Sequence, residues 1–142
     1  VMGVKIRELA DDAVTLKEIL KSTLSDTADR MMDGDTVGKP SNNPLMPPVD
    51  TGESIGLGAS KLTITFGISK SLMKKIGLSS KIPDAFKDLP HFPNDQLIDD
   101  YSDGDLMIQA CSNDSQVSFH AVHNLVRPFR DIVKVRWAQS GF

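Results

Sequence analysis

The pattern of hydrophobic and polar positions predicts two strand–helix–strand units in this chain. Apolar residues at every second position indicate strands, and apolar residues three and four positions apart indicate amphipathic helices. In order, the predicted elements are a strand over residues 1–7, a helix that ends near Met32, a strand over 61–67, a short helix over 70–76, a strand over 106–111, a helix between a cap at 112–114 and Pro128, and a strand over 132–138.

This order, with a long connection between the two units, matches the split β-α-β arrangement of ferredoxin-like domains. We therefore expect an α+β fold of the βαββαβ type, with a four-stranded antiparallel sheet and the two main helices on one of its faces. The other face would be open. The chain has 142 residues, which is typical of one domain, here residues 1–142.

The same alternation assigns side chains to faces of the last strand and of the last helix. In the strand, one face is expected to carry Val133, Val135 and Trp137, and the other Lys134 and Arg136. In the helix, the side opposite the apolar arc is expected to be a solvated polar face that carries His120, His123, Asn124 and Arg127.

Two irregular segments, residues 36–60 and 78–104, interrupt the predicted elements. Both contain several prolines, which exclude regular structure. A loop as long as 36–60 is often functional, although a surface loop packed on something outside this chain is the simpler interpretation. The second segment leads into an acidic cluster at positions 95, 99, 100, 103 and 105. It does not fit a calcium loop, because Tyr101 and Ala110 would occupy ligand positions.

Composition excludes several classes of function. The net charge is −3, so there is no general basic field to hold nucleic acid or an anionic membrane. No apolar run approaches the roughly 18 residues of a transmembrane helix. The one cysteine, Cys111, permits neither an intrachain disulfide nor a cysteine-based metal site, and its apolar strand predicts a small buried side chain.

The histidines are the main candidates for chemistry. His120 and His123 are three positions apart on a helix, so their side chains are neighbours and would suit a shared metal. A catalytic zinc site needs a third ligand, and no H-E-x-x-H pattern supplies one. Solvated histidines on a polar face are the favoured interpretation. His91, between Pro90 and Phe92, is interpreted as a packing residue of a loop.

Common catalytic motifs are missing from the sequence. There is no G-x-S-x-G turn and no phosphate-binding loop, and Gly56-Leu57-Gly58 lacks the third glycine of a dinucleotide-binding turn. Trp137 and Tyr101 would suit electron transfer at a surface, but packing is the favoured role. The residues by themselves therefore indicate a ferredoxin-like domain, a fold that hosts many functions.

Several runs of residues nevertheless resemble one family, the dye-decolorizing (DyP-type) haem peroxidases. Its nearest branch is the twin-arginine-exported, deferrochelatase-like one. The matching runs are Val49–Glu53, Leu62–Ile68, Gly77-Leu78, Leu89–Phe92, Gly104–Asp114, Gln116–Leu125 and Val135–Phe142. They occur in the family's order and span most of the chain. One departure is His123, where the resemblance implies arginine in many relatives.

The resemblance implies a haem b enzyme that reduces hydrogen peroxide while oxidising dyes or other donors, with iron release from haem as a further activity. It implies two ferredoxin-like halves, of which this chain is the first, with the C-terminal half as its partner. The haem apparatus, including a Gly-x-x-Asp-Gly motif, belongs to the second half. Neither Asp33-Gly34 nor Asp103-Gly104 has the leading glycine of this motif.

None of His91, His120 and His123 matches the family's haem ligand, so no catalytic, cofactor-binding or metal-binding residue is expected in this chain. The chain alone is expected to lack peroxidase activity. Its open sheet face makes self-association plausible, and a homo-oligomer is expected. The resemblance further implies an exported or cell-surface protein that uses the twin-arginine route.

Two other hypotheses stay open at this stage. One is a stand-alone, dimeric ferredoxin-like module that binds haem or another ligand without catalysis. The other is metal-dependent hydrolysis, which rests only on His120 and His123.

Overall fold

A computed structural model describes residues 2–6, 13–37 and 42–141. Its elements, in order, are β1 (Met2–Ile6), α1 (Ala13–Met32), β2 (Thr63–Ile68), α2 (Lys70–Lys75), η1 (Ser79–Lys81), η2 (Asp99–Tyr101), β3 (Leu106–Cys111), α3 (Ser115–Val126), η3 (Arg127–Phe129) and β4 (Val133–Ala138), where η denotes a short 3₁₀ helix. The predicted order of strands and helices is confirmed, with the three 3₁₀ turns added in the connections.

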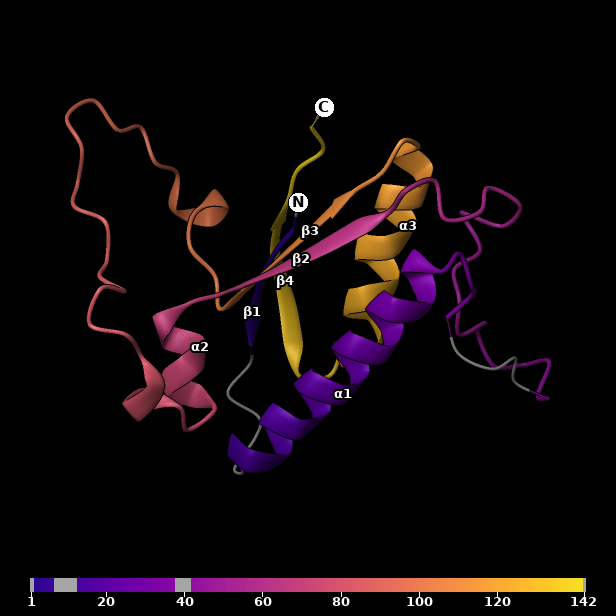
Figure 1. The fold of residues 1–142 in the computed structure, drawn as a ribbon, viewed down its shortest axis with the longest axis horizontal. Helices are drawn as coiled ribbons and strands as arrows, with labels where there is room; N and C mark the ends of the chain where they lie inside the picture. The colour runs from indigo at the N-terminus through magenta and orange to yellow at the C-terminus, as the bar shows by residue number, and fades with distance from the viewer. Residues whose placement is uncertain (1, 7–12, 38–41, 142) are drawn as a thin grey trace.

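The four strands form one sheet in the order β2-β3-β1-β4, and every neighbouring pair is antiparallel. Helices α1 and α3 lie side by side on one side of the sheet (Figure 1) and contact each other. This is the ferredoxin-like βαββαβ arrangement, so the fold expected from the sequence is confirmed. None of the described helices is long and apolar enough to cross a membrane.

The core lies between the helix pair and the sheet. In α1 the buried side chains recur at Leu20, Leu24, Ala28 and Met31, which is one stripe of an amphipathic helix. They meet buried residues of α3 and of the strands, which are Val117, Ala121, Val122, Leu125, Leu106, Ile108 and Val133. The apolar periodicity of the sequence therefore identified the main core-facing side of both helices.

A β-bulge at the end of β4 overturns one predicted face. The register between β1 and β4 shifts between Gly3 and Val4, which pair with Trp137 and Val135 respectively. Arg136 is therefore an extra residue without a partner of its own. Because one extra residue reverses the alternation of side chains, Trp137 lies on the face opposite Val135. The prediction that grouped Trp137 with the valines of this strand is wrong for that reason.

The prediction of a buried Cys111 is also wrong, because the side chain is exposed. Cys111 ends β3, in which Leu106 and Ile108 are buried against the helices. Positions 107, 109 and 111 of β3 alternate with them and lie on the sheet face away from α1 and α3. There Gln109 Nε2 lies 3.4 Å from Cys111 Sγ. Whether a strand residue is buried depends more on which face of the sheet its position lies on than on whether its residue type is apolar.

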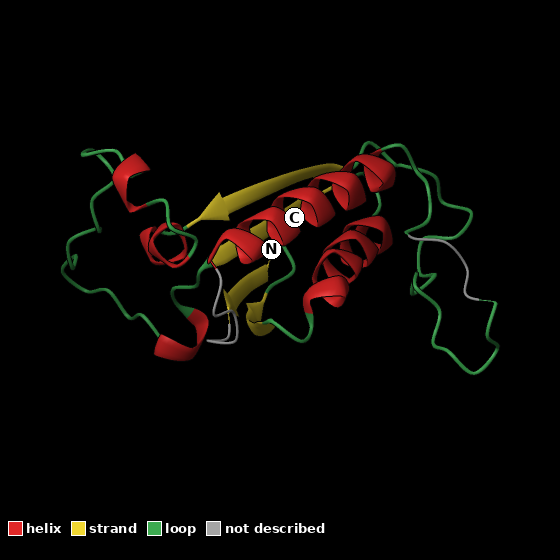
Figure 2. Cartoon of the chain, turned by 90° about the horizontal axis from the view of Figure 1, so that it is seen from below, coloured by secondary structure: helices red, strands yellow, loops and turns green. Residues whose placement is uncertain are grey.

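The two irregular segments extend in opposite directions from the body formed by the helices and the sheet (Figure 2). The second returns to the sheet through two contacts with β4: Arg136 donates to the Asp99 carbonyl at 2.6 Å, and Trp137 Nε1 donates to the Asp103 carbonyl at 3.1 Å. Because of the bulge, the side chains of Arg136 and Trp137 both point toward the segment that leads into β3.

The acidic cluster is divided rather than gathered around an ion. Asp105 is buried and accepts from Lys75 Nζ at 2.8 Å, whereas Asp99 and Asp100 belong to η2 on the surface. Within the described residues no group of three or more His, Cys, Asp or Glu side chains is placed to hold a metal ion.

Candidate functional site

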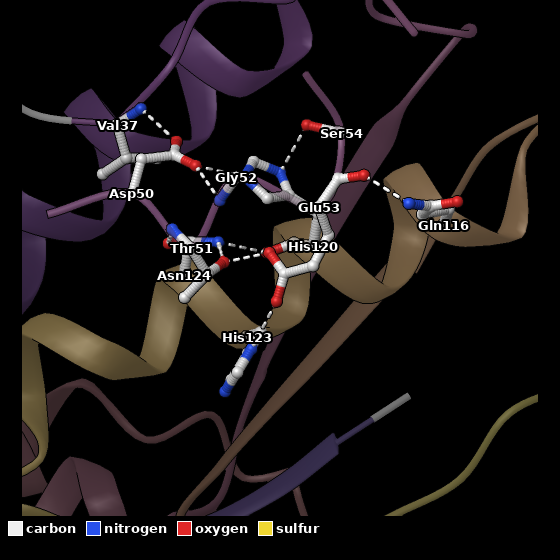
Figure 3. A network of polar contacts seen from close by, with 10 residues as sticks. All are labelled: Val37, Asp50, Thr51, Gly52, Glu53, Ser54, Gln116, His120, His123 and Asn124. Atoms are coloured by element: carbon white, nitrogen blue, oxygen red, sulfur yellow. Dashed lines mark hydrogen bonds and ion pairs between the residues drawn. The ribbon is translucent and has the colours of Figure 1, made fainter. Parts of the chain in front are cut away.

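The most concentrated set of polar contacts joins residues 50–54 to α3. Figure 3 shows the loop lying along the helix with its side chains directed at His120, His123 and Asn124. We call this set of contacts the clasp: Asp50, Thr51, Glu53 and Ser54 on the loop, and Gln116, His120, His123 and Asn124 on α3. It covers the side of α3 that the sequence predicted to be solvated.

His120 is the centre of the clasp and is only 4% exposed. Its Nε2 lies 2.9 Å from Asp50 Oδ1, and its Nδ1 lies 2.9 Å from Ser54 Oγ. Because a carboxylate only accepts, Nε2 carries the proton and donates to Asp50. The Ser54 hydroxyl can donate to Nδ1 or accept from it, so the pair is satisfied in either charge state of the imidazole. The predicted solvated role of His120 is wrong.

Asp50 is held by the backbone as well as by His120. Its Oδ2 accepts from the Val37 N–H, and its Oδ1 accepts from the Gly52 N–H, both at 2.7 Å. Gly52 has φ +80°, a left-handed conformation that glycine adopts without strain, and this turn brings its N–H back to Asp50. Burial raises the pKa of Asp50, but the hydrogen bonds from Val37, His120 and Gly52 outweigh it and hold the pKa below its ordinary value.

Asn124 ties the loop backbone to the helix. It is 1% exposed, its Oδ1 accepts from the Thr51 N–H at 3.1 Å, and its Nδ2 donates to the His120 carbonyl at 3.0 Å. The Nδ2 also donates to Thr51 Oγ1. A buried amide with all of these partners satisfied fixes the position of the loop, because each broken contact would leave a buried polar group unpaired.

Glu53 forms the outer end of the clasp. Its Oε1 lies 3.0 Å from His123 Nδ1, its Oε2 accepts from the Thr51 hydroxyl, and its backbone carbonyl accepts from Gln116 Nε2. Burial raises the pKa of Glu53, but the hydrogen bonds from Thr51 and His123 more than offset it and lower the pKa. His123 also contacts the ring of Phe119, with centroids 5.5 Å apart.

The structure therefore separates the two histidines that the sequence placed together. His120 pairs with Asp50 inside the clasp, and His123 pairs with Glu53 at its edge. The prediction that both histidines lie on one helix, three positions apart, is confirmed. Each of them, however, pairs with a different carboxylate of the same loop. His91 is exposed in the second irregular segment, 3.6 Å from Asp95, and belongs to neither group.

Sequence reasoning missed the loop half of the clasp. Asp50, Glu53 and Ser54 stand in a segment rich in proline and glycine, 66–70 residues before their histidine partners. The available signal was a run of hydrogen-bonding residues, Asp-Thr-Gly-Glu-Ser, within a loop too long to be an ordinary connection.

Asp50, His120 and Ser54 also have the order of carboxylate, imidazole and hydroxyl that activates serine nucleophiles. Ser54 and His120 line a small pocket whose wall also includes Asp35. A carboxylate in the wall of such a pocket opposes the negative charge that develops during acyl transfer. The three side chains therefore suit a hydrogen-bonded structural role that fixes the loop better than they suit a nucleophilic site.

Comparison with known proteins identifies the family. The family model described as Dyp-type peroxidase, N-terminal, matches residues 4–142. The chain belongs to this family. The resemblance inferred from the sequence is thereby confirmed, and the clasp is a feature of a DyP-type N-terminal domain.

The relatives of this DyP-type domain are much longer than the domain. The deferrochelatase of Escherichia coli (strain K12) is 33% identical over 102 residues, which cover 70% of this chain and 24% of the relative. A DyP-type peroxidase from Streptomyces coelicolor has a TM-score of 0.84 and 32% identity, over 99% of this chain and 35% of that one. Ferric DtpA from Streptomyces lividans has a TM-score of 0.81 and 32% identity over the same shares. The DyP-type domain thus spans a quarter to a third of these proteins.

Proposed function

We propose that this DyP-type domain is the N-terminal part of a haem-dependent peroxidase, which reduces hydrogen peroxide while it oxidises dyes or other electron donors. The family match over residues 4–142 carries the proposal. The agreement in fold and sequence with solved DyP-type peroxidases supports it. A relative described as ferric supports an iron cofactor, for which the sequence resemblance implies haem b. Residues 1–142 would then form one ferredoxin-like domain of a larger enzyme.

The histidines of this domain do not fit the axial ligand of a haem. Both ring nitrogens of His120 are engaged, and the side chain is buried. His123 is paired with Glu53 and is 52% exposed, and the His91 side chain is 80% exposed. A haem needs an enclosed apolar pocket around its ligand. We therefore derive no step of peroxide chemistry from these residues and propose that the haem ligands lie in the remainder of the protein.

The role proposed for the chain itself is structural. The buried core and the clasp hold the sheet, α3 and residues 50–54 in one arrangement. The clasp combines neutral hydrogen bonds, each contributing about 0.5–1.5 kcal/mol, with charge-assisted ones of about 1.5–3 kcal/mol. Such a scaffold can present a rigid wall to the rest of the enzyme without contributing a reacting group.

Spectroscopy and steady-state kinetics on the longer protein test the proposal. We expect about one haem per chain by its Soret absorption, together with dye oxidation that requires hydrogen peroxide. Residues 1–142 produced alone are expected to show neither. A longer protein that binds no haem and oxidises no dye in the presence of peroxide would overturn the proposal.

One outcome would favour the stand-alone haem-binding module instead. It is a stoichiometric Soret band from residues 1–142 alone that disappears on His123→Ala. The matched control is His91→Ala, a substitution at the most exposed of the histidines.

Further properties of the longer protein follow from its relatives. We propose release of iron from haem as a second activity, because relatives of this chain are deferrochelatases. Export by the twin-arginine route and a homo-oligomeric state are proposed on the resemblance, with hydrogen peroxide and an electron donor as the molecules that the enzyme meets. Metal-dependent hydrolysis finds no support in the described residues, where His120 and His123 take separate carboxylate partners.

A further inference from the structure

The second irregular segment exposes several large apolar side chains. Between residues 82 and 101, which we call the arm, six of them are exposed: Phe86, Leu89, Phe92, Leu97, Ile98 and Tyr101. Leu89 is 84% exposed and Leu97 is 73% exposed. Single exposed apolar residues are ordinary, but this many on one short segment indicate a surface that is normally covered.

Few contacts with the rest of the described chain hold the arm in place. Its backbone hydrogen bonds, such as Phe86 N–H to Pro83 O and Asp95 N–H to Phe92 O, are local turns. Its side-chain contacts with other elements include the Lys70–Asp88 ion pair at 3.0 Å, in its first half, and the Arg136 contact to Asp99, near its C-terminal end. In Figure 1 the arm is the salmon-to-orange trace that follows α2 and η1 and loops out away from α1 and α3.

Solved relatives have a long chain beyond the part that matches this one. The superposition on the Streptomyces coelicolor peroxidase covers 99% of this chain with a TM-score of 0.84, and about two thirds of that relative's chain lies outside the match. A further chain of that length offers a surface against which the exposed apolar side chains of the arm can be buried.

We propose that the arm is a docking element for the remainder of the same polypeptide, with its apolar side chains buried against that part in the complete protein. This inference rests on the proposed function, because it requires the longer enzyme. The occupant is the same chain rather than a second copy, since about two thirds of the solved relative's chain lies outside the matched part and is available to cover the arm. The contact would be apolar. On docking, a large hydrocarbon surface would be removed from water at each of Leu89, Phe92 and Leu97.

Thiol labelling of the complete protein tests the proposal. Leu89→Cys and Leu97→Cys variants are treated with a maleimide in native buffer and in denaturant, and the labelled peptide is quantified by mass spectrometry. We expect labelling in native buffer to be at least about tenfold slower than in denaturant at both positions. Leu45→Cys, at a residue that is 91% exposed in the other irregular segment, is the matched comparison.

The labelling rates show whether the arm is covered in the complete protein and by what. Native labelling as fast as in denaturant at both positions would overturn the proposal. Protection that vanishes on dilution, together with a change from dimer to monomer in light scattering, would assign the arm to a second copy and equally overturn it. Haem content and peroxidase activity of the unmodified protein are measured in parallel. Slow labelling of the arm in a protein that binds no haem would overturn the proposed function but not the docking element. Haem binding together with fast labelling of the arm would overturn the docking element but not the proposed function.

Discussion

Asp50 shows how one buried carboxylate can organise a loop. It receives hydrogen bonds from two backbone N–H groups and from His120, and these lower its pKa from the ordinary 3.8; the pKa of Glu53 is likewise lowered from 4.5. A carboxyl whose folded-state pKa is depressed contributes stability that is fully present above its unfolded pKa. That stability is lost as the pH falls through the folded pKa. The clasp is therefore expected to weaken in acid, from about pH 4.5 downward.

The Asp50→Asn substitution tests this expectation. At pH 7 it should lower the free energy of unfolding by about 1–3 kcal/mol, because the Val37 and Gly52 N–H groups and His120 lose a charged acceptor. The difference from the unchanged protein should shrink as the pH falls below about 4. Urea unfolding at both pH values measures it, with the exposed Asp26→Asn on α1 as the control. A difference that is the same at both pH values would contradict the role given to the Asp50 charge.

A substitution at His123 is expected to raise the free energy of unfolding rather than lower it. The resemblance implies arginine at this position in many relatives, and the structure shows its partner, Glu53 Oε1, at 3.0 Å from Nδ1. A guanidinium stays charged at every pH of interest and can bind a carboxylate through two N–H groups. His123→Arg is therefore expected to raise the free energy of unfolding by up to about 1 kcal/mol at pH 8, the range of partly exposed ion pairs.

The control for this substitution is His123→Gln, which keeps a hydrogen-bond donor without a charge. Thermal unfolding at low and at high ionic strength distinguishes the two, because only the charged pair is weakened by salt. A His123→Arg protein no more stable than the His123→Gln protein at low salt would contradict the ion-pair explanation.

At the level of elements, hydrophobic periodicity predicted the order of strands and helices, and it failed where a distant segment intervenes. His120 and Asn124 lie on the polar side of α3, as the helical wheel has them. A wheel cannot show that a loop more than 60 residues away in sequence covers that side. Trp137 was misplaced because a bulge adds one residue to β4, which an alternating pattern does not reveal. Local sequence encodes local structure, and these errors arise from long-range contacts.

The packing of α3 gives a prediction at this level. Leu125 is fully buried between the helices and the sheet. Leu125→Ala removes buried hydrocarbon and leaves a cavity, so it is expected to lower the free energy of unfolding by about 2–5 kcal/mol. Phe119→Ala, on the same helix but 60% exposed, should cost no more than about 1 kcal/mol. Chemical denaturation of both variants compares them, and equal losses would place the core elsewhere than between α1, α3 and the sheet.

At the level of the whole molecule, this domain has a well-formed core and two irregular segments whose apolar side chains that core does not cover. The first segment is fastened to α3 by the clasp, yet five of its large apolar residues remain exposed, namely Leu45, Met46, Val49, Ile55 and Leu57. The arm carries larger exposed apolar residues, among them Phe86, Phe92 and Tyr101, and no comparable set of polar contacts among the described residues fastens it. Exposed apolar surface of this kind favours self-association when its proper partner is absent. Residues 1–142 produced alone are therefore expected to associate in a concentration-dependent way.

The source of that association can be identified by substitution. In residues 1–142 alone, a Leu89→Ser, Leu97→Ser double variant should shift sedimentation toward the monomer, because it removes the two most exposed leucines of the arm. A Leu45→Ser, Met46→Ser variant removes comparable apolar surface from the other segment and should shift it less, since Met46 is 58% exposed and the arm retains its apolar residues. Equal shifts would mean that neither segment dominates. No shift in either variant would assign the association to the open face of the sheet, where Trp137 and Cys111 lie.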